Sequence, residues 1–109
     1  MSDNPGDNWG GIIMGSYYRH FKGRYYQVVG EALDTSTDSP VVVYRTLYPS
    51  QYSLVTRPAE EFFGEVLLAD GTRTARFSPV NASDLPEDAA RYACDRPFDF
   101  PVSGAGGVR

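Results

Sequence analysis

The sequence has few of the residues that build metal or redox sites, with one cysteine and one histidine among 109 residues. The single cysteine, Cys94, excludes an internal disulfide, which is typical of proteins in a reducing compartment. A protein metal site usually draws on several His, Cys or carboxylate ligands, and His20 and Cys94 lie in different predicted elements. The glycines match no phosphate-binding fingerprint either. We therefore expect no metal and no cofactor.

Long apolar runs and an excess of positive charge are also missing. No run approaches the roughly 18 apolar residues of a membrane-spanning helix, and the polar start of the chain lacks the apolar core of a signal peptide. We expect a cytoplasmic protein without a membrane partner. The net charge of −4 argues against a general nucleic-acid coat, which needs an excess of Lys and Arg. Residues 16–57 nonetheless hold five cations and three acids, so a locally basic face is compatible with the sequence.

Tyrosine and β-branched residues are abundant: 14% of the residues are aromatic, and eight of these are tyrosines. Such residues suit the pleated, half-buried surface of a strand. Pro58 ends the last of four predicted strands, and residues 59–63 form a helical turn that buries Phe62 or Phe63. Gly30 inside the second strand indicates a bulge or a sharp bend. The strands are predicted over 17–21, 24–33, 41–48 and 52–56, followed by a hairpin over 65–77 that turns at Asp70-Gly71.

The pattern changes after residue 80. Ser83 or Asp84 suits an N-cap, Glu87 lies near the N3 position, and an alanine-rich stretch follows, which together predict a C-terminal helix of roughly two to three turns. The fold class is mainly β, a small SH3-like antiparallel roll or barrel with one helical turn and a C-terminal helix. The alternative is an open antiparallel sheet with the helix on one face. The chain divides into a flexible arm (1–15), a β domain (16–80), a helical segment (81–97) and a flexible tail (98–109).

Two blocks of residues carry a likeness to a known family. The first is YRHFKG over residues 18–23, followed by Tyr26, Val28 and Ala32. The second is VVY over residues 42–44, followed by Leu47-Tyr48, Arg57-Pro58, Phe62 and Val66, with Arg76-Phe77 closing the pattern. Together they resemble the bacterial domain of unknown function family 1653 over about residues 15–78. The resemblance implies an SH3-like β-roll and no established activity. The loop DTSTDSP differs from the His and Glu-Thr pair that the family tends to carry there.

The alternation of side chains along a strand sorts the aromatic and basic residues onto two faces. Tyr18 and His20 share one face of the first strand, with Arg19 and Phe21 on the other. One face of each barrel strand is core, so about half of the aromatic residues are structural. The remainder are expected to edge a shallow groove in which rings and cationic groups meet a ligand. The predicted binding residues are Tyr18, Arg19, His20, Lys22, Tyr26, Tyr44, Tyr48 and Arg57, and we expect Tyr18, His20, Tyr26, Tyr44 and Arg57 to cluster.

A more specific hypothesis concerns the contacts of Arg57. This arginine precedes Pro58, which favours extended backbone geometry, and it lies at the end of a predicted strand. A guanidinium offers five donors in a fixed fork and is well suited to fixing local geometry. We expect an acidic side chain or backbone carbonyls near the turn over 59–63 to hold it.

These features favour a non-enzymatic binding module whose partner is a peptide, a protein or a short nucleic-acid segment. A basic stripe through Arg19, Lys22, Arg45 and Arg57 would favour phosphate, whereas a mixed hydrophobic groove would favour a peptide. One alternative is a small enzyme or accessory subunit that uses His20 and nearby tyrosines, although no group that would position His20 as a base is visible. Another is self-association through an apolar surface. No catalytic residue is assigned, and the oligomeric state is open.

Overall fold

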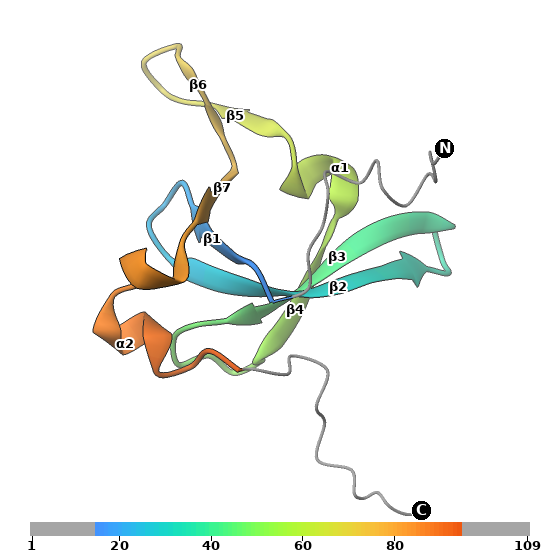
Figure 1. The fold of residues 1–109 in the computed structure, drawn as a ribbon. Coiled ribbons are helices and arrows are strands. Elements are labelled where there is room, and N and C mark those ends of the chain that lie inside the picture. The colour runs from blue at the N-terminus through green and yellow to red at the C-terminus, as the bar shows by residue number, and fades with distance from the viewer. Residues whose placement is uncertain (1–14, 95–109) are drawn as a thin grey trace, which may run out of the picture.

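The two longest strands, β2 and β3, correspond to the strands predicted over 24–33 and 41–48, and they pair with each other in the computed structural model, which describes residues 15–94 (Figure 1). β-branched and aromatic residues dominate both, because such side chains pack well on a pleated surface. The helical turn follows Pro58, as predicted. The elements are β1 (Tyr17–His20), β2 (Tyr25–Asp34), β3 (Ser39–Thr46), β4 (Leu54–Pro58), α1 (Ala59–Phe62), β5 (Glu65–Leu67), β6 (Arg73–Ala75), β7 (Phe77–Val80), the 3₁₀ turn η2 (Ala82–Asp84) and α2 (Glu87–Ala90).

Five strands form one antiparallel sheet in the order β4-β3-β2-β1-β7, and β5 and β6 form a separate two-stranded sheet. The fold is therefore the mainly β, SH3-like roll that the sequence predicts, with short helical elements. In Figure 1 the β5–β6 hairpin projects from the body of the roll, and β7 returns beside β1. The predicted hairpin over 65–77 is correct for β5 and β6, but its second strand ends at Ala75 instead of running through residue 77. Arg76 separates β6 from β7, and Phe77 pairs with His20 in the main sheet.

The bulge predicted at Gly30 is present. The register of β2 against β3 shifts between Val28, which pairs with Tyr44, and Gly30, which pairs with Val43. An extra residue in one strand exchanges the faces of all the residues beyond it. Ala32, which would share a face with Val28 in a regular strand, therefore lies on the opposite face.

The core lies between the sheet and α1. Its buried members include Val28, Val42, Tyr44, Phe62 and Phe77. The two adjacent phenylalanines at the end of α1 differ in burial: Phe62, its last residue, is 0% exposed, whereas Phe63, which caps it, is 38% exposed. The prediction that one of the pair is buried is confirmed, and a single helical turn is enough to place it on the sheet.

The C-terminal helical segment is shorter than the sequence predicts. Leu85 precedes Pro86 and has an extended backbone with ψ 133°, because the proline ring disfavours helical geometry in the preceding residue. This break divides the region into η2 and α2, and the residue preceding α2 is Pro86 rather than Ser83 or Asp84. The predicted arm before residue 15 and the tail over 98–109 lie outside the described residues, as do residues 95–97 of the predicted helical segment.

Candidate functional site

The residues expected to cluster lie on one side of the main sheet. Tyr18 pairs with Tyr26 across β1 and β2, and Val28 pairs with Tyr44 across β2 and β3. Arg57 pairs with Val42, two residues before Tyr44. Directly paired residues share a face, and so do residues two apart in a regular strand. We call this side the inner face and the opposite side the outer face.

The rings of the inner face pack edge to face. The centroids of Tyr26 and Tyr44 are 5.1 Å apart, those of Tyr18 and Phe62 are 5.2 Å apart, and those of His20 and Phe77 are 4.9 Å apart. Tyr44 is 4% exposed and belongs to the core, whereas Tyr18, His20 and Tyr26 are half-buried. The cluster is therefore partly structural, and only its half-buried members are accessible at the surface.

His20 is held as a neutral imidazole. Its Nδ1 accepts a hydrogen bond of 3.1 Å from the Lys22 amide, so in the neutral ring the proton is on Nε2. Burial lowers the pKa of His20, and the nearby cations Arg57, Arg76 and Lys22 lower it further. His20 thus presents a weak N–H donor beside three cationic side chains.

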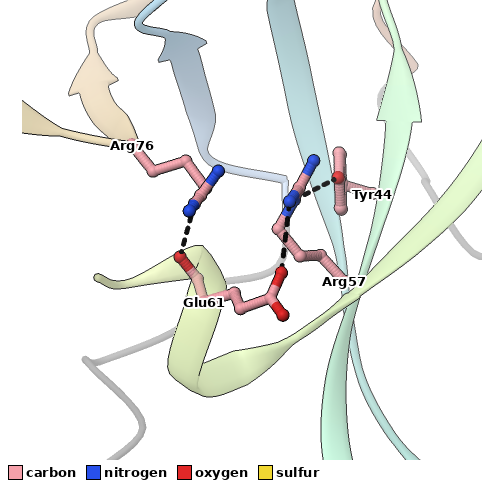
Figure 2. A network of polar contacts seen from close by, with 4 residues as sticks. All are labelled: Tyr44, Arg57, Glu61 and Arg76. Atoms are coloured by element: carbon pink, nitrogen blue, oxygen red, sulfur yellow. Dashed lines mark hydrogen bonds and ion pairs between the residues drawn. The ribbon is translucent and has the colours of Figure 1, made fainter. Parts of the chain in front are cut away.

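Arg57 has the kind of partner that the sequence predicts. Its Nη1 donates to Glu61 Oε1 at 3.3 Å, and its Nε donates to the Tyr44 hydroxyl at 3.3 Å (Figure 2). Burial alone would lower the pKa of Arg57, but the hydroxyl and the carboxylate outweigh it and raise the pKa. The guanidinium is shared between two groups rather than bound bidentately to one carboxylate. Arg76 Nε donates to the Glu61 backbone oxygen at 3.2 Å and completes the network.

Tyr48 extends the site toward the β1–β2 turn. Its hydroxyl and that of Tyr26 are 2.9 Å apart in a hydrogen bond. Burial, followed by this hydrogen bond, raises the pKa of Tyr26, and the proximity of Arg24 only partly opposes the increase. The Arg24 guanidinium lies 4.2 Å from the centroid of the Tyr48 ring, a cation–π contact. We use the name aromatic–basic face for Tyr18, His20, Tyr26 and Tyr48 together with Lys22, Arg57 and Arg76.

Not every predicted binding residue joins this face. Arg19 is exposed on the outer face, because it alternates with Tyr18 and His20. Arg45 pairs with Gln27, so it also belongs to the outer face. Lys22 does belong to this face through its proximity to His20, although its side chain is exposed in the turn with its Nζ 5.9 Å from the Phe21 ring. The basic stripe through Arg19, Lys22, Arg45 and Arg57 does not form on a single face.

The sequence reasoning expected an acidic partner for Arg57 near residues 59–63 without naming Glu61, and it did not assign Arg76 and Phe77 to the site. Glu61 lies four positions after Arg57, a spacing that favours ion pairs and was visible in the sequence. Arg76 and Phe77 were noted only as the end of the family pattern, because the pairing of β7 with β1 has no local signal. Long-range strand pairing is what brings them to His20.

The outer face is held differently. Gln27 is 2% exposed, and its Nε2 donates to the Cys94 backbone oxygen at 2.8 Å while its Oε1 accepts from the Cys94 amide at 2.9 Å. These two bonds fasten the segment over 80–94 to the middle of β2. Among the described residues, no group of three His, Cys, Asp or Glu side chains is placed to hold a metal.

Comparison with known proteins supports the sequence resemblance. The family described as "Protein of unknown function (DUF1653)" matches residues 16–79. A crystal structure of a DUF1653 protein from Bordetella bronchiseptica is 33% identical in sequence and superposes with a TM-score of 0.55, covering 62% of this chain and 87% of that one. None of the curated proteins matches this chain. The match over more than half of its length places this chain in the DUF1653 family.

Proposed function

We propose that this protein is a non-enzymatic binding module that recognises a segment of a partner protein through the aromatic–basic face. The observation that carries the proposal is the convergence of half-buried Tyr18, His20 and Tyr26 with three cations around the imidazole. Aromatic edges supply apolar contact area, and cations beside them attract an acidic group of the partner. Because only a few charges converge on this face, we expect its affinity for the partner segment to be modest.

A protein segment fits better than a nucleic acid. Arg19 and Arg45 face away from Arg57, and Glu61 neutralises part of the charge of Arg57. Binding to a phosphate backbone draws on many cations that neutralise phosphates together. The net charge of −4 adds a general repulsion.

The enzymatic alternative has less support. No carboxylate among residues 15–94 hydrogen-bonds to His20, whose Nδ1 is already used by the Lys22 amide. The nearby carboxylate of Glu61 is engaged by Arg57. A general base needs a positioned partner and a pKa tuned to its task, and here the pKa is lowered by burial and cations.

The proposed setting is the cytoplasm of a bacterium. Residues 15–94 include no helix with the length and apolarity needed to cross a bilayer. The DUF1653 structure used for comparison comes from a bacterium, and a sequence with one cysteine suits a reducing compartment.

Titration followed by NMR tests the proposal. The full chain is titrated with a proline-rich peptide, a basic peptide, an acidic peptide and a short single-stranded RNA, while the ring signals of His20 and the tyrosines are recorded. Shifts of His20, Tyr18 and Tyr26 with a peptide but not with RNA are expected. His20→Ala should weaken binding, and Tyr52→Ala, which alters a ring that is 66% exposed, serves as the control. RNA binding at these rings, or no shift with any probe, overturns the proposal.

A further inference from the structure

A groove of about 690 Å³ opens where the family domain meets the segment over 80–94. One wall comes from the β1–β2 turn and the residues after β3, and the other comes from α2 and the residues that follow it. Its volume lies within the range of typical ligand sites, roughly 300–1,000 Å³. The residues that give the groove its chemistry are Arg24, Tyr25, Tyr48, Pro49, Arg91 and Tyr92.

The rings of the groove are partly fixed and partly available. Tyr48 is held by its hydrogen bond to Tyr26 and is covered on one face by Arg24. Within the described chain, the hydroxyls of Tyr25 and Tyr92 make no hydrogen bond, although both residues are half-buried in the wall. They are therefore placed to donate to the backbone carbonyls of a ligand.

The charge of the groove is a small positive excess. Arg24 and Arg91 are exposed at the groove, and Asp88 is the one acid among its lining residues. Among residues 15–94, neither guanidinium forms an ion pair. An excess of one positive charge matches a single carboxylate. A nucleotide phosphate carries more charge and would face Asp88, so the groove is less suited to it.

We propose that this groove binds an extended, proline-containing segment of a partner protein that carries one acidic residue; this inference goes beyond the proposed function, because the groove shares only Tyr48 with the aromatic–basic face. A polyproline segment leaves all its carbonyls free for donors such as the two tyrosine hydroxyls, and its rigidity lowers the entropic cost of binding in an aromatic groove. The acidic residue pairs with Arg24 or Arg91. Because residues 86–92 lie outside the family match, this wall gives the chain a specificity of its own.

The test uses the full chain and two capped heptapeptides, one with six prolines around a central aspartate and one with asparagine in its place. The aspartate peptide should shift the ring signals of Tyr25 and Tyr92. Calorimetry should show the asparagine peptide binding about tenfold more weakly, because it loses a charge-assisted hydrogen bond. Arg91→Glu should weaken binding of the aspartate peptide by at least tenfold, whereas the matched change Arg73→Glu on the distant β6 should leave it unchanged. Tyr92→Phe, which keeps the ring and removes the donor, should weaken binding by a smaller factor.

The outcomes separate the two proposals. Peptide shifts confined to Tyr18, His20 and Tyr26 would overturn the groove proposal and leave the proposed function standing. Shifts of Tyr25 and Tyr92 by adenosine monophosphate without peptide binding would make the groove a nucleotide site and overturn it.

Two other occupants would also overturn the proposal. If Arg91→Glu changes the sedimentation of the chain from associated to monomeric and the peptide does not bind, the groove is an interface between copies. If Pro101→Ala shifts Tyr25 and Tyr92 without any peptide, residues 95–109 of the chain itself fill it.

Discussion

The inner face of the sheet and its outer face are stabilised by different physics. On the inner face, rings such as Phe62, Phe77 and Tyr44 pack edge to face or stack, and most of the stabilisation comes from removing apolar surface from water. On the outer face, a buried amide, Gln27, holds the segment over 80–94 by two hydrogen bonds. Packing of rings on the inner face tolerates changes in ring orientation but is sensitive to the loss of side-chain volume. The hydrogen bonds of Gln27 on the outer face form in only one side-chain geometry.

The largest loss of stability should come from removing a buried ring from the inner face. Phe62→Ala is expected to lower the free energy of unfolding by about 3–5 kcal/mol, because it removes a fully buried ring and leaves a cavity in the core. Phe63→Ala is the matched control in the same helical turn and should cost less than about 1 kcal/mol, since Phe63 is 38% exposed. Denaturant unfolding measures both. Equal losses for the two variants would mean that α1 does not define the core.

A smaller loss of stability is expected from breaking the two hydrogen bonds between Gln27 and the Cys94 backbone. Gln27→Leu removes both hydrogen bonds to the Cys94 backbone and should lower the free energy of unfolding by about 2 kcal/mol. Hydrogen exchange should accelerate at the Cys94 amide and through α2 more than in β3. Gln51→Leu is the control, because Gln51 is exposed. If Cys94 and β3 lose protection equally, the C-terminal segment is not a separately fastened unit.

The same contrast explains what the sequence could predict. Local signals were sufficient for β2, β3, the Gly30 bulge and the turn after Pro58, because each depends on residues near in the chain. They were insufficient for β7, whose partner β1 lies more than fifty residues earlier.

In the candidate site, too, the features with a local sequence signal were predicted, and those that depend on distant segments were not. The alternation of side chains along the first strand placed Tyr18 and His20 on one face correctly. It could not show that Arg19 and Arg45 lie on the opposite face from Arg57, because that depends on the pairing between strands. The role of Gln27 had no sequence signal, because a glutamine in a strand is ordinarily a solvent-facing residue and only the returning segment buries it. The groove was missed for the same reason, since its second wall comes from α2.

The hydrogen bonds of Arg57 with Tyr44 and Glu61 should contribute less to stability than the buried Phe62 ring or the bonds of Gln27. Arg57→Lys keeps the charge but cannot reproduce the separate bonds to the Tyr44 hydroxyl and Glu61, so a loss of about 1 kcal/mol is expected. Arg73→Lys is the matched control, because Arg73 is exposed and lies 3.9 Å from Glu65. Thermal and denaturant unfolding should agree on the order of the two variants. An unchanged midpoint for Arg57→Lys would remove any structural role for the network.

The smallest effect concerns the protonation of His20, where the aromatic core meets the cations. In the folded chain the pKa of His20 lies below its ordinary value, because of burial and the proximity of Arg57 and Arg76. The unfolded chain, with a pKa of about 6.5, therefore binds the proton first as the pH falls. Between the two pKa values the unfolded state holds more protons, so His20 favours folding above about pH 6.5 and loses this contribution as the pH falls through its folded pKa.

Denaturant unfolding between about pH 7.5 and 5 should show a smaller loss of stability for His20→Gln than for the parent chain, since the other titrating groups are shared. A parent chain that gains stability relative to His20→Gln on acidification would mean that the imidazole is stabilised in its charged form, contrary to its position among three cations.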